Sequence, residues 1–447
     1  MSIGSDTSVS SGHKPTMSTA RTIVAASSGN LVEWFDFYIY AFFSVYFADK
    51  FFTGTGETGA LLKSAAVFFV GFLMRPLGGY IFGRIADRHG RKNSMLIAII
   101  MMCTGSLLMA ILPTAETVGV LAPVLLLLVR CLQGISVGGE YGSTATYMSE
   151  VAAENRRGFY SSFQYVTLIG GQLLASLLAV VMTFFLTEEE IANGWWRLPF
   201  VIGACAAVVA LWLRSHLHET ASAESRNASS AGSFREVLAH PRAFWVVLGI
   251  TAAGSLSFYT FTTYMQKYLI NTGGFAKADV AQAMTLCLFL FMLLQPAIGA
   301  FSDRIGRKNS MLIFVVGMVL IPVPLFAFLG GQESLVACMA GIMVAMFFLS
   351  FYTSVSGIVK AEMFPAHIRG LGVGFTYAIA NSLFGGSAES IALGLKDMGW
   401  AWAFPWYVVA ICVLGLIAVC FMRDNRQHST IDGKGEAWEN RHDRAGL

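Results

Sequence analysis

Charged residues are scarce in this chain. Lys, Arg, Asp and Glu together make up 13% of its 447 residues, whereas apolar residues make up 55%. Soluble domains carry about a quarter charged residues, so this composition excludes an ordinary water-soluble protein. A membrane-spanning helix needs about 20 apolar residues. The chain therefore has room for roughly a dozen such helices and for little else.

Several signatures of enzymes and binding proteins are also missing. None of the seven cysteines forms a C-x-x-C pair with metal-binding spacing, and no Walker loop is present. The pattern GISVG at 134–138 matches a hydrolase motif, but it lies inside an apolar run and not at a strand-to-helix turn. The basic residues lie in short loops without interleaved aromatic residues, which argues against nucleic-acid binding. We expect no enzyme activity, no metal and no cofactor.

What the sequence has in abundance is long apolar runs. Each run should be a helix, because backbone groups in lipid must be hydrogen-bonded within their own segment. The runs do not alternate as the strands of a β-barrel would. The twelve predicted spans are 23–48, 60–85, 94–113, 119–148, 157–186, 195–214, 242–270, 278–300, 310–329, 335–361, 368–395 and 400–422.

Basic residues set the expected orientation. Placing both termini and the loops after the even-numbered spans on one side collects most of the 30 Lys and Arg residues there, which predicts that this side is cytoplasmic. We expect a multi-pass protein of the plasma (inner) membrane that functions as a monomer in the bilayer. The predicted parts are a cytoplasmic tail (1–20), a six-helix bundle (21–214), a cytoplasmic linker (215–241), a second bundle (242–422) and a cytoplasmic tail (423–447).

The two bundles share internal repeats. GRIADRHGRKNSML at 83–96 returns as GAFSDRIGRKNSML at 299–312, and EVAAENRRG at 150–158 shares Glu, Arg and Gly at the same spacing with EMFPAHIRG at 362–370. Each pair follows the same helix of its half, which indicates an internal duplication. Parallel repeats of this kind are typical of transporters that rock two bundles around a midplane site.

These motifs resemble a known family. G-x-x-x-D-R-x-G-R-K at 83–92 and R-x-x-Q-G-x-x-x-G at 130–138 resemble the signature motifs of the major facilitator superfamily. SSGNLVEWFDFYIY at 27–40 is similar to its metabolite:proton symporter family, and GGSAESIAL at 385–393 resembles the α-ketoglutarate-transporting branch of that family. The resemblance implies two pseudo-symmetric six-helix bundles and proton-coupled import of a small dicarboxylate, α-ketoglutarate, by alternating access.

Two other functions stay open at this stage. The first is the same machine with another organic acid or osmolyte as substrate, since other branches of the family carry shikimate, citrate, or proline and betaine. Those branches tend to place proline where this chain has Glu389. The second is a membrane nutrient sensor without net transport, which would be expected to carry a sizeable soluble output segment.

The repeated loop predicts a conformational latch. Asp87 and Asp303 should lie against helix N-termini of the opposite half, where exposed N–H groups favour a carboxylate. A simpler interpretation is that the basic residues only keep the loop inside the cell. The residues assigned to the latch are Gly83, Asp87, Arg88, Gly90, Arg91, Glu150, Asp303, Arg304, Gly306, Arg307 and Glu362.

Charges within the spans indicate a transport pathway, because each costs roughly 2.5–3.5 kcal/mol in the bilayer. Arg75 is the predicted substrate anchor, since a guanidinium matches the planar geometry of a carboxylate and stays charged. The alternative is a structural ion pair with Glu33.

Proton coupling needs a carboxyl group whose pKa responds to its surroundings. Glu33 and Asp36 lie three residues apart on one helix face, and Glu140 is a rival carrier. Arg130 is assigned to organisation of its half or to the proton relay. Permanent salt bridges to Arg75 or Arg130 are the alternative.

The remaining candidates would line the cavity around a small organic anion. Aromatic residues in spans more often pack against a neighbouring helix, Lys267 could extend to the interface, and Arg197 could anchor that interface beside two tryptophans. The candidates are Tyr259, Tyr264, Lys267, Tyr352, Glu389 and Arg197.

Overall fold

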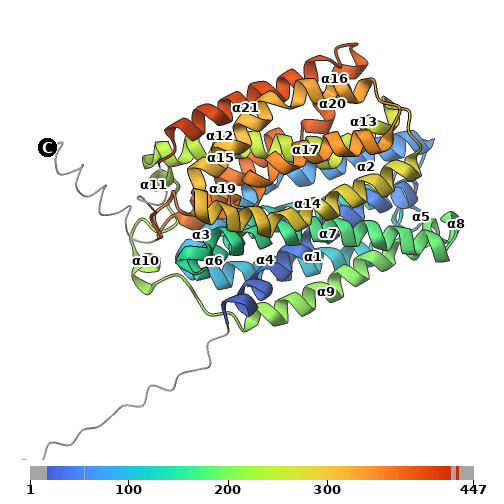
Figure 1. Ribbon diagram of the computed structural model, residues 1–447. Coiled ribbons are helices and arrows are strands. Elements are labelled where there is room, and N and C mark those ends of the chain that lie inside the picture. Colours follow the sequence, from blue (N-terminus) through green and yellow to red (C-terminus); the bar gives the residue numbers. More distant parts are fainter. Residues whose placement is uncertain (1–17, 55, 424–428, 432–447) are drawn as a thin grey trace, which may run out of the picture.

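The computed structural model describes residues 18–54, 56–423 and 429–431. Within these residues every regular element is a helix, and the long helices lie side by side with their axes roughly parallel (Figure 1). The all-helical fold predicted from the apolar runs is confirmed. The predicted tails at 1–20 and 423–447 lie largely outside the described residues, and the first helix already begins at Thr19.

Among the described residues, six long helical segments precede the predicted linker. Two short helices, α5 (Ala115–Val118) and α8 (Glu188–Ala192), lie at the end of the molecule opposite to the described chain ends (Figure 1). The long segments are α1 (Thr19–Phe51), α2 (Gly56–Leu73) with α3 (Arg75–His89), α4 (Arg91–Ile111), α6 (Leu121–Val151), α7 (Arg157–Phe185) and α9 (Leu198–Ser215).

Six further segments follow the linker, and several are divided. They are α12 (Pro241–Tyr259) with α13 (Met265–Asn271), α14 (Lys277–Ile305), α15 (Arg307–Leu320) with α16 (Pro322–Gly330), α17 (Leu335–Thr353) with α18 (Ser356–Ala361), α19 (Arg369–Ala380) with α20 (Ala388–Asp397), and α21 (Ala403–Phe421).

The divisions depart from the continuous spans that hydropathy predicts. Among the described residues, ten helices are long and apolar enough to cross a membrane, and the pair α15 and α16, bent by 43°, makes up to eleven. Pro322 lies at the bend, where it cannot donate the hydrogen bond of a continuing helix. The span predicted at 368–395 consists of α19, a π-helical turn at Asn381–Gly385 and α20. A second π-helical turn, Thr260–Tyr264, joins α12 to α13. Such turns are frequent at functional sites.

The two halves meet along two helix pairs. Helix α7 packs against α14, and α3 packs against α19. Helix α1 begins and α21 ends at the same end of the molecule, which we call the latch end; the opposite end is the open end (Figure 1). The linker is docked on the latch end, because the Gly232 N–H donates to the His367 carbonyl at 2.9 Å and Arg88 Nε donates to the Ala231 carbonyl at 2.9 Å.

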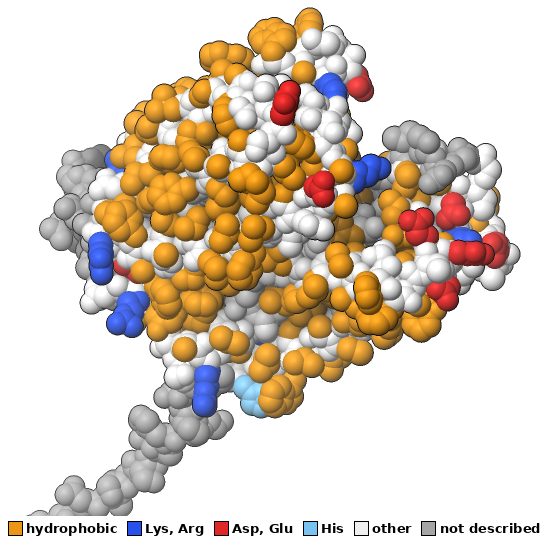
Figure 2. Space-filling model, turned by 45° about the vertical axis from the view of Figure 1, so that its right-hand side comes forward, with side chains coloured by type: hydrophobic (Ala, Val, Ile, Leu, Met, Phe, Trp, Pro, Cys, Tyr) orange, Lys and Arg blue, Asp and Glu red, His pale blue; other side chains and the backbone are white. Residues whose placement is uncertain are grey.

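The outer surface of the bundle is largely apolar. Large side chains such as Leu128, Phe184 and Val209 are exposed on its flanks. Figure 2 shows apolar side chains over most of one flank, with charged side chains gathered towards the two ends. This is the distribution that a hydrocarbon layer around the middle of the bundle requires.

Candidate functional site

A buried arginine lies between the two halves, with no counter-ion among the described residues. Arg75 begins α3 at the break from α2, and its side chain is 2% exposed. Its guanidinium carbon lies 3.8 Å from the centroid of the Phe72 ring and 4.9 Å from that of Phe37. Among the described residues, Nη1 and Nη2 have no hydrogen-bond partner. A guanidinium desolvated without an anion is costly, so this environment suits the binding of an anion.

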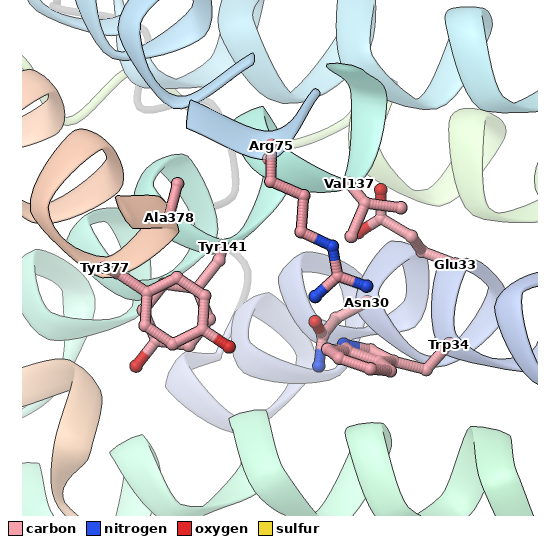
Figure 3. Close-up of a pocket in the computed structure, with 9 residues that line it drawn as sticks. Asn30, Glu33, Trp34, Arg75, Val137, Tyr141, Tyr377 and Ala378 are labelled. Carbon is pink, nitrogen blue, oxygen red and sulfur yellow. The ribbon is translucent and has the colours of Figure 1, made fainter. Parts of the chain in front are cut away.

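Arg75 faces a small cavity between the halves (Figure 3). Its free volume is about 10 Å³, roughly enough for one water molecule. The cavity is lined by Asn30, Glu33, Trp34, Arg75, Val137, Gly138, Tyr141, Tyr377 and Ala378. The first seven of these residues belong to the N-terminal half, and the last two belong to α19 of the C-terminal half.

The alternative of a permanent Arg75–Glu33 ion pair is absent from this conformation. Glu33 is buried at 3% exposure and lines the same cavity. Within the part of the chain that the structure describes, its carboxylate has no hydrogen bond or salt bridge to Arg75. The two groups thus share a cavity while each remains available to another partner.

Asp36 belongs to a buried polar chain beside this cavity. Its Oδ1 accepts a hydrogen bond from the Ser106 hydroxyl at 2.6 Å, and its Oδ2 accepts one from Gln133 Nε2 at 2.6 Å. Gln133 Oε1 accepts from Arg130 Nη1 at 2.7 Å. The Arg130 guanidinium in turn lies 4.1 Å from the centroid of Tyr40. Arg130 therefore communicates with Asp36 through Gln133 rather than by a direct salt bridge.

Glu140 is committed to a partner that the sequence did not single out. It forms a buried ion pair with Arg214 of α9, and Arg214 Nη1 lies 2.8 Å from Glu140 Oε2. The Thr144 hydroxyl also donates to Glu140 at 2.6 Å. The predicted free carrier is thus held by a salt bridge in this conformation. Arg214 was overlooked because it lies at the end of an apolar run, where basic residues usually mark topology.

The open end contains a much larger vestibule. Its volume is about 380 Å³, and Figure 2 shows the hollow between two lobes of the molecule. Tyr259, Lys267 and Glu389 line it, as predicted for the cavity wall, and Lys267 forms a salt bridge with Glu389. The Tyr259 hydroxyl is buried and has no partner among the described residues.

Three predicted cavity residues lie elsewhere. Tyr264 packs against Phe404 with ring centroids 5.1 Å apart. Tyr352 is completely buried against Phe314 and lines neither the cavity nor the vestibule. Arg197 Nη1 donates to the carbonyls of Ala110 and Leu112 at 2.9 and 2.7 Å, where it satisfies the C-terminal end of α4. Sequence alone does not tell which way a side chain on a helix faces. These residues therefore lie in the predicted spans, but their side chains do not face the cavity.

Lys360 is a second buried cation that the sequence analysis missed. It lies in α18 at 1% exposure, and its ammonium donates to the hydroxyls of Tyr141, Ser356 and Tyr352 at 2.8, 2.6 and 3.2 Å. It lies next to the last residue of the span predicted at 335–361 and was not counted among the charges within the spans. The signal that could have found it is the polar and aromatic spacing within the same run, FYTSVSGIVK at 351–360.

The latch end is closed by two equivalent contacts. Asp87 accepts hydrogen bonds from the backbone N–H groups of Gly370 and Leu371 at 2.8 and 2.9 Å, at the start of α19. Asp303 accepts from the N–H groups of Gly158 and Phe159 at 2.8 and 3.0 Å, at the start of α7. Each aspartate lies at a helix N-terminus of the other half, which is the geometry expected from the repeat.

Arginines surround these aspartates. Arg91 Nη1 lies 3.1 Å from Asp87 Oδ1, and Arg307 Nη1 lies 3.0 Å from Asp303 Oδ1. Glu150 also bridges the halves, because it lies 3.5 Å from Arg91 Nη2 and 2.8 Å from Arg369 Nη1.

The other residues assigned to the latch lie in or beside the same repeated loops. Glu362 is buried, and its carbonyl accepts from the Thr430 hydroxyl at 2.9 Å, while Arg304 is exposed in the last turn of α14. Gly90 and Gly306 adopt φ values of 104° and 97°, a region that favours glycine, at the turns that begin α4 and α15.

The close approach of the two halves at Gly83 allows the closed latch to be tested by substitution. A Cβ atom there would lie 2.6 Å from the Cα of Leu371 in the opposite half, so Gly83→Ala should disfavour the closed latch by about 1–3 kcal/mol. We expect the population open at the latch end to rise about tenfold. Double electron–electron resonance between labels at the exposed and repeat-related Asn93 and Asn309, in a cysteine-free background, would measure it.

Gly394→Ala is the matched control, because nothing lies within 4 Å of a Cβ at that helical position. Equal distance distributions in the two variants would contradict the assigned contact.

Comparison with known proteins agrees with this architecture. The family model described as Major Facilitator Superfamily matches residues 26–388 and again 274–444. The chain is 57% identical to the alpha-ketoglutarate permease of Escherichia coli K12 over 395 residues, which cover 88% of this chain and 91% of the permease. It is 29% identical to the proline/betaine transporter of Salmonella typhimurium LT2 over 90% of this chain and 83% of that transporter.

Solved structures show the same fold. The proton:xylose symporter XylE bound to 6-bromo-6-deoxy-D-glucose superimposes with a TM-score of 0.72 at 19% identity, covering 90% of this chain and 95% of XylE. A partially occluded inward-open XylE from E. coli gives a TM-score of 0.63 at 16% identity, covering 90% and 97%. By its sequence and by its fold, the chain belongs to the Major Facilitator Superfamily of membrane transporters.

Proposed function

We propose that the protein is a proton-coupled symporter that imports a small dicarboxylate, α-ketoglutarate, by alternating access. The observation that carries this proposal is Arg75, whose buried guanidinium faces a cavity between the halves and has two terminal nitrogens without partners among the residues that the structure describes. The two parallel N–H groups of a guanidinium can donate to the two oxygens of one carboxylate group, and the exclusion of water strengthens these hydrogen bonds. The name of the 57% identical relative supports α-ketoglutarate as the substrate.

Asp36 and Glu33 are the proposed proton-coupling groups. A proton on Asp36 Oδ1 needs only a rotation of the Ser106 hydroxyl, because a hydroxyl group both donates and accepts. The contact of Oδ2 with Gln133, and thus with Arg130, can persist in both protonation states. Glu33 faces the Arg75 cavity, where the charge of a bound anion acts on it directly.

The closed latch and the open vestibule describe one state of the proposed cycle. We assign the latch end to the cytoplasm and both termini to that side, in the plasma membrane. Substrate then enters through the vestibule past Tyr259, Lys267 and Glu389, and leaves when the Asp87 and Asp303 contacts break. One chain contains the complete pathway, so we propose that it works as a monomer.

Uptake of labelled α-ketoglutarate into proteoliposomes containing the purified full-length protein tests the proposal. We expect accumulation only with an inward proton gradient, by up to about tenfold per coupled proton for each pH unit. Succinate should compete, whereas shikimate and betaine should not.

Two results would contradict this expectation in different ways. Competition by shikimate or betaine would preserve the transport cycle and overturn the substrate. Ligand binding without accumulation would overturn transport itself and favour a sensor.

A further inference from the structure

Lys360 is a buried cation that has no role in the transport cycle proposed above. All three protons of its ammonium point at hydroxyl oxygens, those of Tyr141, Ser356 and Tyr352. Among the described residues it forms no salt bridge. A desolvated ammonium held only by neutral groups is costly, so its retention calls for an anion at another stage of function.

Aromatic rings surround the same ammonium. Nζ lies 4.8 Å from the centroid of Tyr141, 4.7 Å from that of Tyr377 and 5.2 Å from that of Tyr352. Because the Tyr141 and Tyr377 rings are parallel with centroids 3.4 Å apart, the ammonium lies at their edges, where the rings stabilise a cation less than a ring face does. The cluster therefore stabilises the positive charge of Lys360 only partly and does not neutralise it.

Two of these tyrosines also line the Arg75 cavity. Tyr141 comes from α6 and Tyr377 from α19, so they belong to opposite halves. Figure 3 shows the two rings overlapping. They are stacked with centroids 3.4 Å apart and an interplanar angle of 7°. Lys360 is not part of the cavity lining itself, but its ammonium lies at the edge of this stacked pair.

The hydrogen bonds of the cluster cross the interface as well. The Tyr141 hydroxyl lies 3.0 Å from the Ser356 hydroxyl and 2.8 Å from Lys360 Nζ, and both of these partners belong to the C-terminal half. Any motion that parts the halves at the latch end must separate Tyr141 from Tyr377 and from Lys360. Separation would remove a hydroxyl donor–acceptor from the ammonium and leave a position for a carboxylate.

We propose that Lys360 binds the second carboxylate of a dicarboxylate whose first carboxylate is held by Arg75, once the Tyr141–Tyr377 stack has opened. This inference rests on the proposed transport function and deepens it. Two cations beside one opening aromatic pair, Arg75 from the N-terminal half and Lys360 from the C-terminal half, select dianions over monoanions. They also place that selection on the latch side of the cavity.

Loss of the Lys360 charge should reduce the preference for dicarboxylates over monocarboxylates, and the effect should depend on the side from which the substrate is presented. In Lys360→Met, the KM for α-ketoglutarate presented from the latch side should rise at least about tenfold, with a smaller change from the open side. For 2-oxobutanoate, which keeps the 2-oxo acid and lacks the second carboxylate, the KM should stay within about twofold. The preference for the dicarboxylate should therefore fall about tenfold or more.

Counterflow in membrane vesicles of both orientations, containing the full chain, measures these constants. Lys63→Met is the matched control, because Lys63 is exposed on α2. Lys360→Arg should restore most of the preference. Lys360→Gln keeps hydrogen-bond donors for the hydroxyls but removes the charge, so it provides a second test if the methionine variant does not fold.

The outcomes separate the two proposals. A wild-type protein that accumulates no dicarboxylate overturns the proposed function. If the wild-type protein does accumulate α-ketoglutarate, but the uncharged Lys360 variants slow both acids equally and keep the wild-type preference, Lys360 only joins the two halves, and this inference alone is overturned.

Discussion

Arg75→Lys should lower the kcat/KM of α-ketoglutarate uptake by about a hundredfold while the protein still folds. Lysine keeps the positive charge but offers no pair of parallel N–H groups, and losing one charged hydrogen bond of this kind costs about 1.5–3 kcal/mol. Initial uptake rates in proteoliposomes over a range of substrate concentrations measure the effect. Arg84→Lys is the control, since Arg84 lies exposed on the same helix, α3.

Arg75→Met separates an anion anchor from a structural ion pair. Removing one partner of a buried salt bridge typically destabilises a protein by 3–5 kcal/mol. Arg75 has no such partner among the described residues, so the methionine variant should lose uptake and keep or raise its unfolding temperature in the absence of substrate. A normal KM in Arg75→Lys, or a marked loss of thermal stability in Arg75→Met, would contradict the anchor assignment.

Neutral replacements at the proposed coupling carboxylates should abolish proton-driven accumulation. Asparagine at position 36 resembles the protonated acid, because its oxygen can accept from Gln133 while its amide group donates to Ser106. In the double variant Glu33→Gln/Asp36→Asn, we expect the ratio of internal to external α-ketoglutarate under a proton gradient to fall to about one. Exchange of internal for external substrate should continue, since it requires no net proton movement.

Asp279→Asn serves as the control for that experiment, because Asp279 is exposed in the first turn of α14. If the double variant still concentrated substrate in response to the gradient, neither carboxylate would carry the coupled proton. Loss of both accumulation and exchange would point to a damaged cavity instead of uncoupling.

The parts of the mechanism that could be predicted depend on rare residues in unusual surroundings. Arg75 was identifiable because a charge in the middle of an apolar run is costly wherever its helix packs. Asp87 and Asp303 were identifiable because the duplication placed each at the same point of its half, and a carboxylate there suits a helix N-terminus. Both predictions needed only local chemistry and the repeat.

Residues near the ends of the spans were harder to assign. Arg214 and Lys360 lie at or near the ends of the spans predicted at 195–214 and 335–361 and were not counted among the charges within the spans, yet one neutralises Glu140 and the other lies beside the Tyr141–Tyr377 stack. Tyr264 and Tyr352 were placed on the correct helices but were expected to face the cavity.

The sequence was sufficient for the class of protein, the long apolar helices, the duplication and the rare charges within the apolar runs. The tertiary structure alone decided which of those charges meet. Hydropathy and spacing report how far a residue lies along a helix, whereas a contact also depends on the rotation and tilt of that helix against segments far away in the chain. For this reason Asp36 is linked to Arg130 through Gln133, and Glu140 to Arg214, by packing that no local pattern specifies.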